Sequence, residues 1–200
     1  TGTLTYRYDD QYNVGPYVEF YDPDAARFAN YNKKVIKAVV DPSMKNANLT
    51  SLESMFFGGI DNFRIISLEN MKSIVGLENL NTANVTNMAS MFLGCNSVET
   101  LDLTTFDVSK VTDMSFMLNS CNALMTIFCN SDWSTSPALT SDQGLFSGST
   151  MIIGGHGTSY DSSTYDKTYA HPDRGASNPG YFTMRGDANG DDHVSITDAV

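Results

Sequence analysis

Two stretches of the chain share one arrangement of apolar and polar positions. The stretch VTNMASMFLGCNSV, residues 85–98, aligns with VTDMSFMLNSCNAL, residues 111–124, at an offset of 26 residues. A weaker copy, LTSLESMFFGG, begins at Leu49, and a degraded copy, SDQGLFSGS, begins at Ser141. A period of this length is typical of repeat proteins, in which each unit buries its apolar side against the next.

Each copy has two halves with different periods. The apolar positions of the first half are Val85, Met88, Met91, Phe92 and Cys95. Their i, i+3, i+4 spacing predicts a short helix with one buried face. In the second half Leu101 and Leu103 alternate with polar residues, which predicts a short strand. We therefore predict an α/β fold, a short leucine-rich-repeat solenoid with one strand and one short helix per repeat.

The three cysteines occupy apolar positions of this pattern. Cys95 and Cys121 lie at the same repeat position, and Cys129 takes the position of Leu103. Two states are compatible with this placement, namely buried free thiols or a disulfide between Cys95 and Cys121. A catalytic thiolate needs a partly exposed, electropositive setting, which these positions do not offer.

Four regions follow from the limits of the repeat. Residues 1–47 are predicted to be an N-terminal β cap, because TLTYRY and KKVIKAVV read as strands. Residues 48–130 form the solenoid, and residues 131–184 form a degraded repeat with an irregular C-terminal cap. The aromatic residues of that cap, Trp133 among them, either seal the last coil or offer rings to a sugar. Residues 185–200 are a partial calcium loop.

Long stretches of the chain resemble a known family. LENLNTANVTNMASMFLGC and LDLTTFDVSKVTDMSFML are similar to the BspA-like leucine-rich repeats of bacterial surface proteins. GTLTYRYDD and the block GGHGTSYDSSTYDKTYAHPDRGASNPGYFT resemble the two ends of that repeat domain, so that the resemblance covers residues 2–183. It implies a secreted or surface-attached bacterial protein that adheres to a host or neighbouring-cell protein or glycan.

The end of the chain, DANGDDHVSITD, fits a twelve-residue calcium loop with oxygen ligands at alternate positions. The expected ligands are Asp187, Asn189, Asp191, His193 through its carbonyl, Ser195 and Asp198. The loop resembles the first half of a type I dockerin, which implies a cohesin partner for a longer protein. The chain ends at Val200, before the following helix, so we expect calcium to bind weakly. Asp187 also ends an Arg-Gly-Asp tripeptide, and its role as a calcium ligand accounts for it without an integrin.

Composition narrows the class of partner. Formal net charge is −11, with 12 Lys and Arg against 23 Asp and Glu, which disfavours nucleic acid and anionic membrane surfaces. The chain has no apolar run of the roughly 20 residues that cross a bilayer. It begins at Thr1, so we expect targeting information to lie outside this segment. Neither an H-E-x-x-H nor a G-x-S-x-G motif is present, and we predict no enzymatic activity.

The outward positions of the strand region carry the functional hypothesis. Thr100, Asp102 and Thr104 alternate with the buried leucines, so we expect them to point to solvent and contact a ligand. The favoured function is a non-catalytic adhesion or binding protein, extracellular or at the cell surface. The alternative is a structural spacer or scaffold, held by the dockerin-like module in a carbohydrate-degrading assembly.

Overall fold

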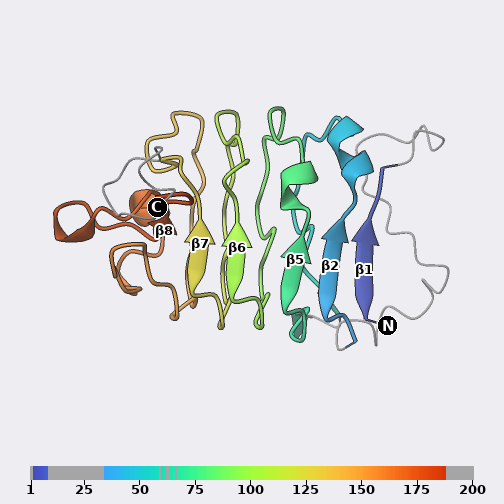
Figure 1. Cartoon of the computed structure of the whole chain (residues 1–200), viewed down its shortest axis with the longest axis horizontal. Coiled ribbons are helices and arrows are strands. Elements are labelled where there is room, and N and C mark those ends of the chain that lie inside the picture. The colour runs from blue at the N-terminus through green and yellow to red at the C-terminus, as the bar shows by residue number, and fades with distance from the viewer. Residues whose placement is uncertain (1, 9–33, 59, 62–63, 66, 188–200) are drawn as a thin grey trace.

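The computed structural model describes residues 2–8, 34–58, 60–61, 64–65 and 67–187. Within these residues the chain winds into coils that lie side by side, and the short strands of the coils point the same way (Figure 1). The parallel strands are β1 (Thr3–Tyr6), β2 (Lys37–Val40), β5 (Ser73–Val75), β6 (Thr100–Asp102), β7 (Thr126–Phe128) and β8 (Phe182–Thr183). The short antiparallel strands are β3 (Ile60–Asp61) and β4 (Arg64–Ile65), and the 3-10 helices are η2 (Pro42–Asn46), η3 (Leu77–Asn79), η4 (Lys167–Tyr169) and η5 (Gly175–Ser177).

The parallel strands form two sheets, ordered β1-β2-β5 and β6-β7-β8. Among the described residues no backbone bridge joins β5 to β6, and Figure 1 shows the wider interval between them. On the return segments of the coils the stack is continuous, because Ser51, Asn87, Asp113 and Ser141 form an unbroken row of parallel bridges. Backbone bridges between coils are therefore interrupted between β5 and β6 on the strand side of the stack, and they are continuous on its return side.

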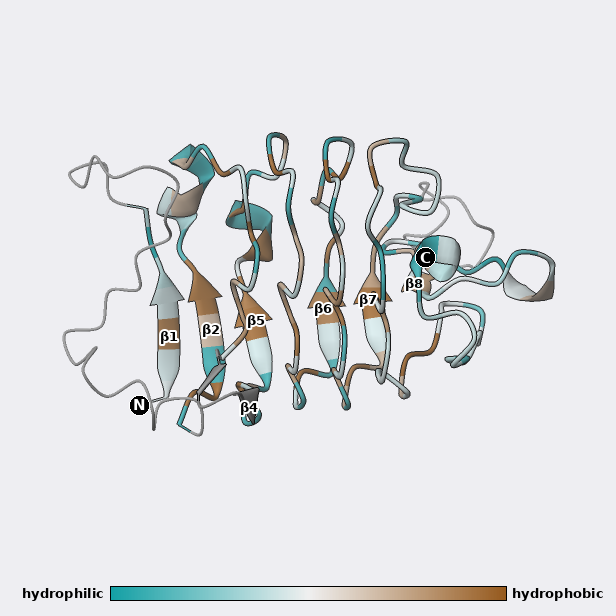
Figure 2. Ribbon diagram, turned by 180° about the vertical axis from the view of Figure 1, so that it is seen from behind, coloured by the Kyte–Doolittle hydropathy of each residue, from teal (hydrophilic) through white to brown (hydrophobic). Residues whose placement is uncertain are grey.

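Strand register places equivalent residues of successive coils beside one another. Leu101 pairs with Ile127, and both are buried, whereas Asp102 pairs with the half-buried Phe128. Figure 2 shows apolar residues recurring at the middle of successive strands. The strand expected around Leu101 is present as β6, with its alternation of buried and outward residues. Assignment of the coils to the leucine-rich-repeat class stays a prediction.

Residues 85–95, where we expected a helix, form a series of tight turns instead. The amide of Met91 donates to the carbonyl of Met88 at 3.2 Å, which is the i+3 to i hydrogen bond of a β-turn. Ser90 and Gly94 have φ values of 56° and 72°, in the left-handed region that interrupts a right-handed helix. The expected short helix is therefore absent from this described segment.

The physical reason is that the neighbouring coil accepts the hydrogen bonds that a helix would form internally. The amide of Met88 donates to Asp113 at 2.8 Å, and that of Phe92 donates to Met117 at 2.9 Å. The side chains of Met88, Phe92 and Met117 are nevertheless fully buried. Repeated tight turns thus bury residues at the spacing that also characterises a helix face.

One apolar core runs through the stack from Tyr6 to Phe182. The rings of Phe56 and Phe92 lie parallel, with centroids 5.2 Å apart, and Tyr6 meets Phe56 edge-on at 5.0 Å. The hydroxyl of Tyr6 donates to the carbonyl of Met55 at 2.7 Å. Since β1 pairs with β2 and β2 pairs with β5, the described part of the predicted N-terminal cap continues the same stack.

The described aromatic residues of the C-terminal cap serve mainly to close the core. Trp133 and Phe182 are fully buried and meet edge-on, with centroids 5.0 Å apart. Phe146 and Tyr181, also fully buried, meet in the same way at 5.1 Å. Because Trp133 is enclosed, its ring is not available to stack on a sugar, which favours the capping interpretation.

Asp173 organises the loops of this cap. Asp173 is 2% exposed, and its carboxylate accepts hydrogen bonds from the amide of His156 at 2.8 Å and the hydroxyl of Thr158 at 2.7 Å. The amides of Gly175 and Gly180 donate to it as well. Burial raises the pKa of this carboxyl, but the hydrogen bonds outweigh that effect and hold the pKa below its usual value.

The three cysteines are buried and unpaired. The thiol of Cys121 donates to the carbonyl of Phe92 in the neighbouring coil at 3.2 Å, and that of Cys95 donates to the carbonyl of Phe56 at 3.6 Å. Burial raises the pKa of Cys95, and it raises the pKa of Cys121 to about 12. The structure thus agrees with the free-thiol alternative.

We predict that the native chain does not react with a thiol reagent at pH 8, because buried thiols with raised pKa values hold little thiolate. After denaturation three thiols should react, one for each cysteine. Titration with a chromogenic disulfide reagent, with and without guanidinium, measures both numbers. A single reactive thiol in the denatured, unreduced chain would instead reveal a Cys95–Cys121 disulfide.

Asp173 should stabilise the folded chain, and this stabilisation should be lost in acid. Its pKa is lowered in the folded state, so its contribution is present above the unfolded pKa of about 3.9 and is lost as pH falls through the folded value. We expect Asp173→Asn to lower the free energy of unfolding at pH 7 by about 2–3 kcal/mol, since an amide cannot accept all these hydrogen bonds. The variant should also lose less stability between pH 5 and pH 3.

Urea unfolding across that pH range, followed by circular dichroism, checks both effects. A matched control is Asp132→Asn, since this exposed carboxylate accepts hydrogen bonds from Ser134. Its free energy of unfolding should change by less than about 1 kcal/mol. Equal losses in the two variants would contradict the role assigned to Asp173.

Candidate functional site

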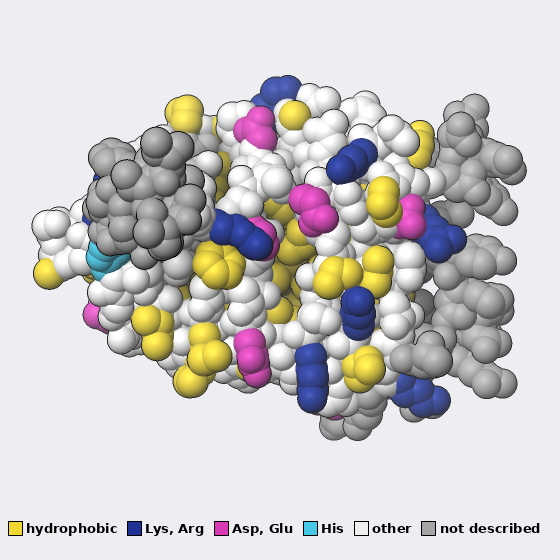
Figure 3. Space-filling model, in the orientation of Figure 1, with side chains coloured by type: hydrophobic (Ala, Val, Ile, Leu, Met, Phe, Trp, Pro, Cys, Tyr) yellow, Lys and Arg dark blue, Asp and Glu magenta, His cyan; other side chains and the backbone are white. Residues whose placement is uncertain are grey.

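The outward side of the parallel strands, which we term the strand face, holds the predicted ligand-binding residues. Thr100 is exposed, and Asp102 and Thr104 are half-buried. Thr100 and Asp102 point outward from the two ends of β6, and Thr104 follows two residues later. Figure 3 shows acidic, basic and apolar side chains interspersed over this surface. The sequence pattern therefore placed these three residues on one surface, as the structure has them.

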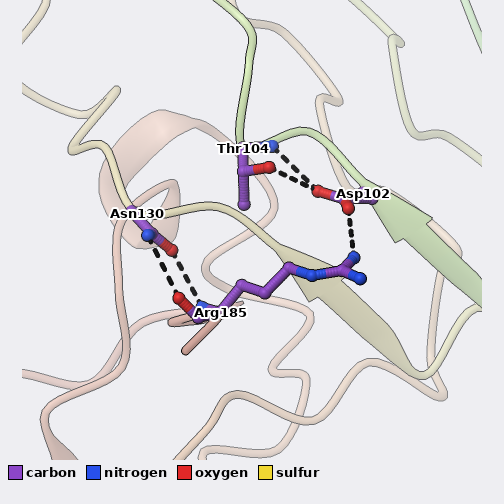
Figure 4. Close-up of polar contacts among 4 residues, drawn as sticks. All are labelled: Asp102, Thr104, Asn130 and Arg185. Carbon is purple, nitrogen blue, oxygen red and sulfur yellow. Dashed lines mark hydrogen bonds and ion pairs between the residues drawn. The ribbon is translucent and has the colours of Figure 1, made fainter. Parts of the chain in front are cut away.

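Asp102 is held in place by its neighbour on the chain. Its Oδ1 atom accepts hydrogen bonds from the hydroxyl of Thr104 at 2.6 Å and from the amide of Thr104 at 3.2 Å. These bonds hold the carboxylate through Oδ1, and Oδ2 faces the guanidinium of Arg185 (Figure 4). Thr104 thus orients the Asp102 carboxylate for contact with a cation.

The cation that meets Asp102 is Arg185, which lies 83 residues later in the chain. A guanidinium nitrogen of Arg185 forms an ion pair with Oδ2 of Asp102 (Figure 4). The guanidinium carbon also lies over the ring of Phe128, 5.4 Å from its centroid. The side chain of Arg185 thus forms an ion pair with a residue of β6 and a cation–π contact with a residue of β7.

Asn130 holds the main chain of the same arginine. Its side-chain oxygen accepts from the amide of Arg185 at 2.8 Å, and its side-chain nitrogen donates to the carbonyl of Arg185 at 3.3 Å. A primary amide that bonds both backbone groups of one residue imitates a strand partner. The cluster of Asp102, Thr104, Phe128 and Asn130, which we term the arginine cradle, therefore contacts both the side chain and the backbone of a residue.

Sequence reasoning identified only half of this cradle. Phe128 and Asn130 lie one repeat after Asp102 and Thr104, at the same offset of 26 residues, so the repeat itself carried a signal for them. In the sequence Arg185 is notable only as the first residue of the Arg-Gly-Asp tripeptide. Its pairing with Asp102 has no local signal, because it depends on how the C-terminal segment crosses the stack.

Beneath the cradle lies the thiol of Cys129, which is fully buried. Burial raises its pKa to about 12, and the nearby charge of Asp102 acts in the same direction. The thiol is accordingly neutral near pH 7 and is not an activated nucleophile. The cradle presents a carboxylate, a carboxamide, a hydroxyl and a ring, which are groups suited to hydrogen bonding and to contact with a cation.

The predicted calcium loop falls almost entirely outside the described residues. Asp187 is described and half-buried, whereas Asn189, Asp191, His193, Ser195 and Asp198 are not among the residues that the structure describes. Across the described ranges no group of three or more His, Cys, Asp or Glu side chains is placed to hold a metal ion. Calcium binding, the dockerin-like module and a cohesin partner stay predictions.

Comparison with known protein families gives a match over the repeats. The sequence profile of a family described as "Mycoplasma protein of unknown function, DUF285" matches residues 28–154, more than half of the chain. No curated protein and no solved structure matches. In the part of the chain that the structure describes, no helix has the length and apolar character needed to cross a membrane.

We predict that Asp102 and Arg185 contribute little to stability, because their side chains are 41% and 58% exposed. A double-mutant cycle of Asp102→Asn and Arg185→Ala should give a coupling free energy of about 0.2–1 kcal/mol that decreases with salt. Thermal unfolding at low and high ionic strength measures it. Coupling well above this range and insensitive to salt would show that the pair is a structural element of the fold.

Proposed function

Because the chain belongs to the DUF285 family, which is surface-associated, we propose that it is a non-catalytic binding protein. Its place of action in this proposal is the cell surface or the extracellular medium. The resemblance of residues 2–183 to BspA-like repeats favours adhesion to a protein or glycan of a host or neighbouring cell. The formal net charge of −11 favours a partner surface with positive charge.

The observation that carries the proposal is the composition and order of the strand face around β6 and β7. Outward residues there come from strands in fixed register, so their mutual positions are set by backbone hydrogen bonds. Asp102 is oriented by Thr104, and Phe128 offers a partly exposed ring beside it. Preorganised polar groups next to an aromatic ring are typical of binding surfaces, since little ordering cost remains on association.

The chemistry of the described residues also supports binding rather than catalysis. The thiols of Cys95, Cys121 and Cys129 are buried, and burial raises the pKa of each. The carboxylate of Asp102 contacts Thr104 and Arg185, groups that orient it and balance its charge. These are contacts that hold a surface in shape and do not activate a nucleophile.

The test is binding of the whole chain to immobilised matrix proteins and glycans, with calcium and with a chelator. Thr100→Arg places a bulky cation on the strand face and should weaken binding by roughly tenfold or more. Thr112→Arg is the matched control, because Thr112 is an exposed threonine on the return side of the stack. Its affinity should equal that of the unaltered chain.

Three results would contradict the proposal. One is loss of binding in Thr112→Arg with Thr100→Arg unaffected, which would move the binding surface to the return side. Another is a complete absence of binding by a chain that unfolds cooperatively, which would favour a spacer. The third is binding that disappears in chelator for all variants, which would assign it to the calcium loop.

A further inference from the structure

We infer that the arginine cradle is a peptide-binding site for an arginine residue, and that Arg185 occupies it in place of an arginine from a cationic partner. The inference rests on the proposed function, because it takes the strand face as the binding surface and names the chemistry of its ligand. Arg185 is then an internal competitor that a partner displaces.

The contacts select a guanidinium group over other cations. Arg185 both pairs with the carboxylate of Asp102 and lies over the ring of Phe128 at 5.4 Å. A planar, delocalised guanidinium can stack on a ring while its edge donates to a carboxylate. A lysine ammonium is a compact, strongly hydrated charge that lacks this planar geometry. The cradle should therefore prefer arginine to lysine.

The cradle also recognises peptide backbone. Asn130 accepts from the amide and donates to the carbonyl of Arg185, so it contacts the parts that every arginine residue in a peptide has. Backbone pairing of this kind supplies affinity for an extended segment, and side-chain contacts supply its specificity. An arginine within a peptide should thus bind better than a free guanidinium ion.

Strand register, rather than the occupant, sets the position of the carboxylate and the ring. Asp102 and Phe128 are cross-strand partners in the register of β6 and β7, and Thr104, two residues after β6 ends, fixes the carboxylate. The occupant is held weakly, because the side chains of Arg185 and Asp102 are 58% and 41% exposed and water screens their attraction. A weakly held internal ligand leaves the site open to exchange.

The experiment uses the full chain and three labelled pentapeptides, acetyl-Ser-Gly-Xaa-Gly-Ser-amide, with arginine, lysine or citrulline at the central position. Citrulline keeps the shape of arginine without its charge. Three proteins are compared: the unaltered chain, Arg185→Ala, and Arg185→Ala with Asp102→Asn. Asparagine retains the oxygen that accepts from Thr104, so this substitution removes charge and leaves the local turn. Affinity is measured by nuclear magnetic resonance titration at low salt.

Arg185→Ala should bind the arginine peptide several-fold more tightly than the unaltered chain, because the side chain that competes for Asp102 and Phe128 is gone. In that variant the arginine peptide should bind roughly tenfold more tightly than the lysine or citrulline peptide. Adding Asp102→Asn should weaken arginine binding by roughly tenfold. Thermal unfolding of each protein verifies that the variants are folded.

Equal binding of the arginine and lysine peptides would overturn the inference, as would unchanged binding after Asp102→Asn or no binding to folded Arg185→Ala. None of these results alters the panel test with Thr100→Arg and Thr112→Arg. If that test still assigns binding to the strand face, only the arginine specificity fails. If it assigns binding elsewhere while the arginine peptide binds, the cradle stands and the broader proposal fails.

Discussion

Hydrogen bonding between neighbouring coils is the constraint on which this molecule depends. Short strands and tight turns leave many backbone donors without a partner in their own coil, and unpaired buried amides are costly. Each coil solves this with the next, as when the amide of Ser90 donates to Ser115 at 2.8 Å and that of Gly94 donates to Asn119 at 2.9 Å. A coil in isolation would lose these bonds together with its buried apolar side, so folding is a property of the stack.

The same constraint explains unusual backbone conformations at equivalent positions. Ser54, Ser90, Phe116 and Gly144 all have φ between 56° and 65°, although only the last is glycine. Non-glycine residues tolerate this region at a cost of order 1–2 kcal/mol each. The bonds made with neighbouring coils on either side offset that cost, and they keep the turns in line from one coil to the next. The regular return side in turn supports the register that places Asp102 beside Phe128.

The sequence indicated those features that depend on the repeat. Its offset of 26 residues, the strand around Leu101 and the burial of the cysteines all agree with the structure. The helix predicted over residues 85–95 was wrong, because a coil made of tight turns buries apolar residues at the same spacing as a helix. Half of the arginine cradle was also foreseeable, since Asp102 and Thr104 alternate with buried leucines. The contact between Asp102 and Arg185 was not, because it joins residues far apart through an irregular cap that has no period.

The division between β5 and β6 has a mechanical consequence. The return side of the stack, where the bridges are continuous, resists bending more than the strand side. The stack should therefore bend most easily between β5 and β6, where the bridges are interrupted. The continuous row of bridges from Ser51 to Ser141 would act as the hinge, and the two sheets would rotate toward or away from each other about it. The curvature of the strand face, and with it the shape of partner that fits, would then be adjustable at one line rather than distributed along the molecule.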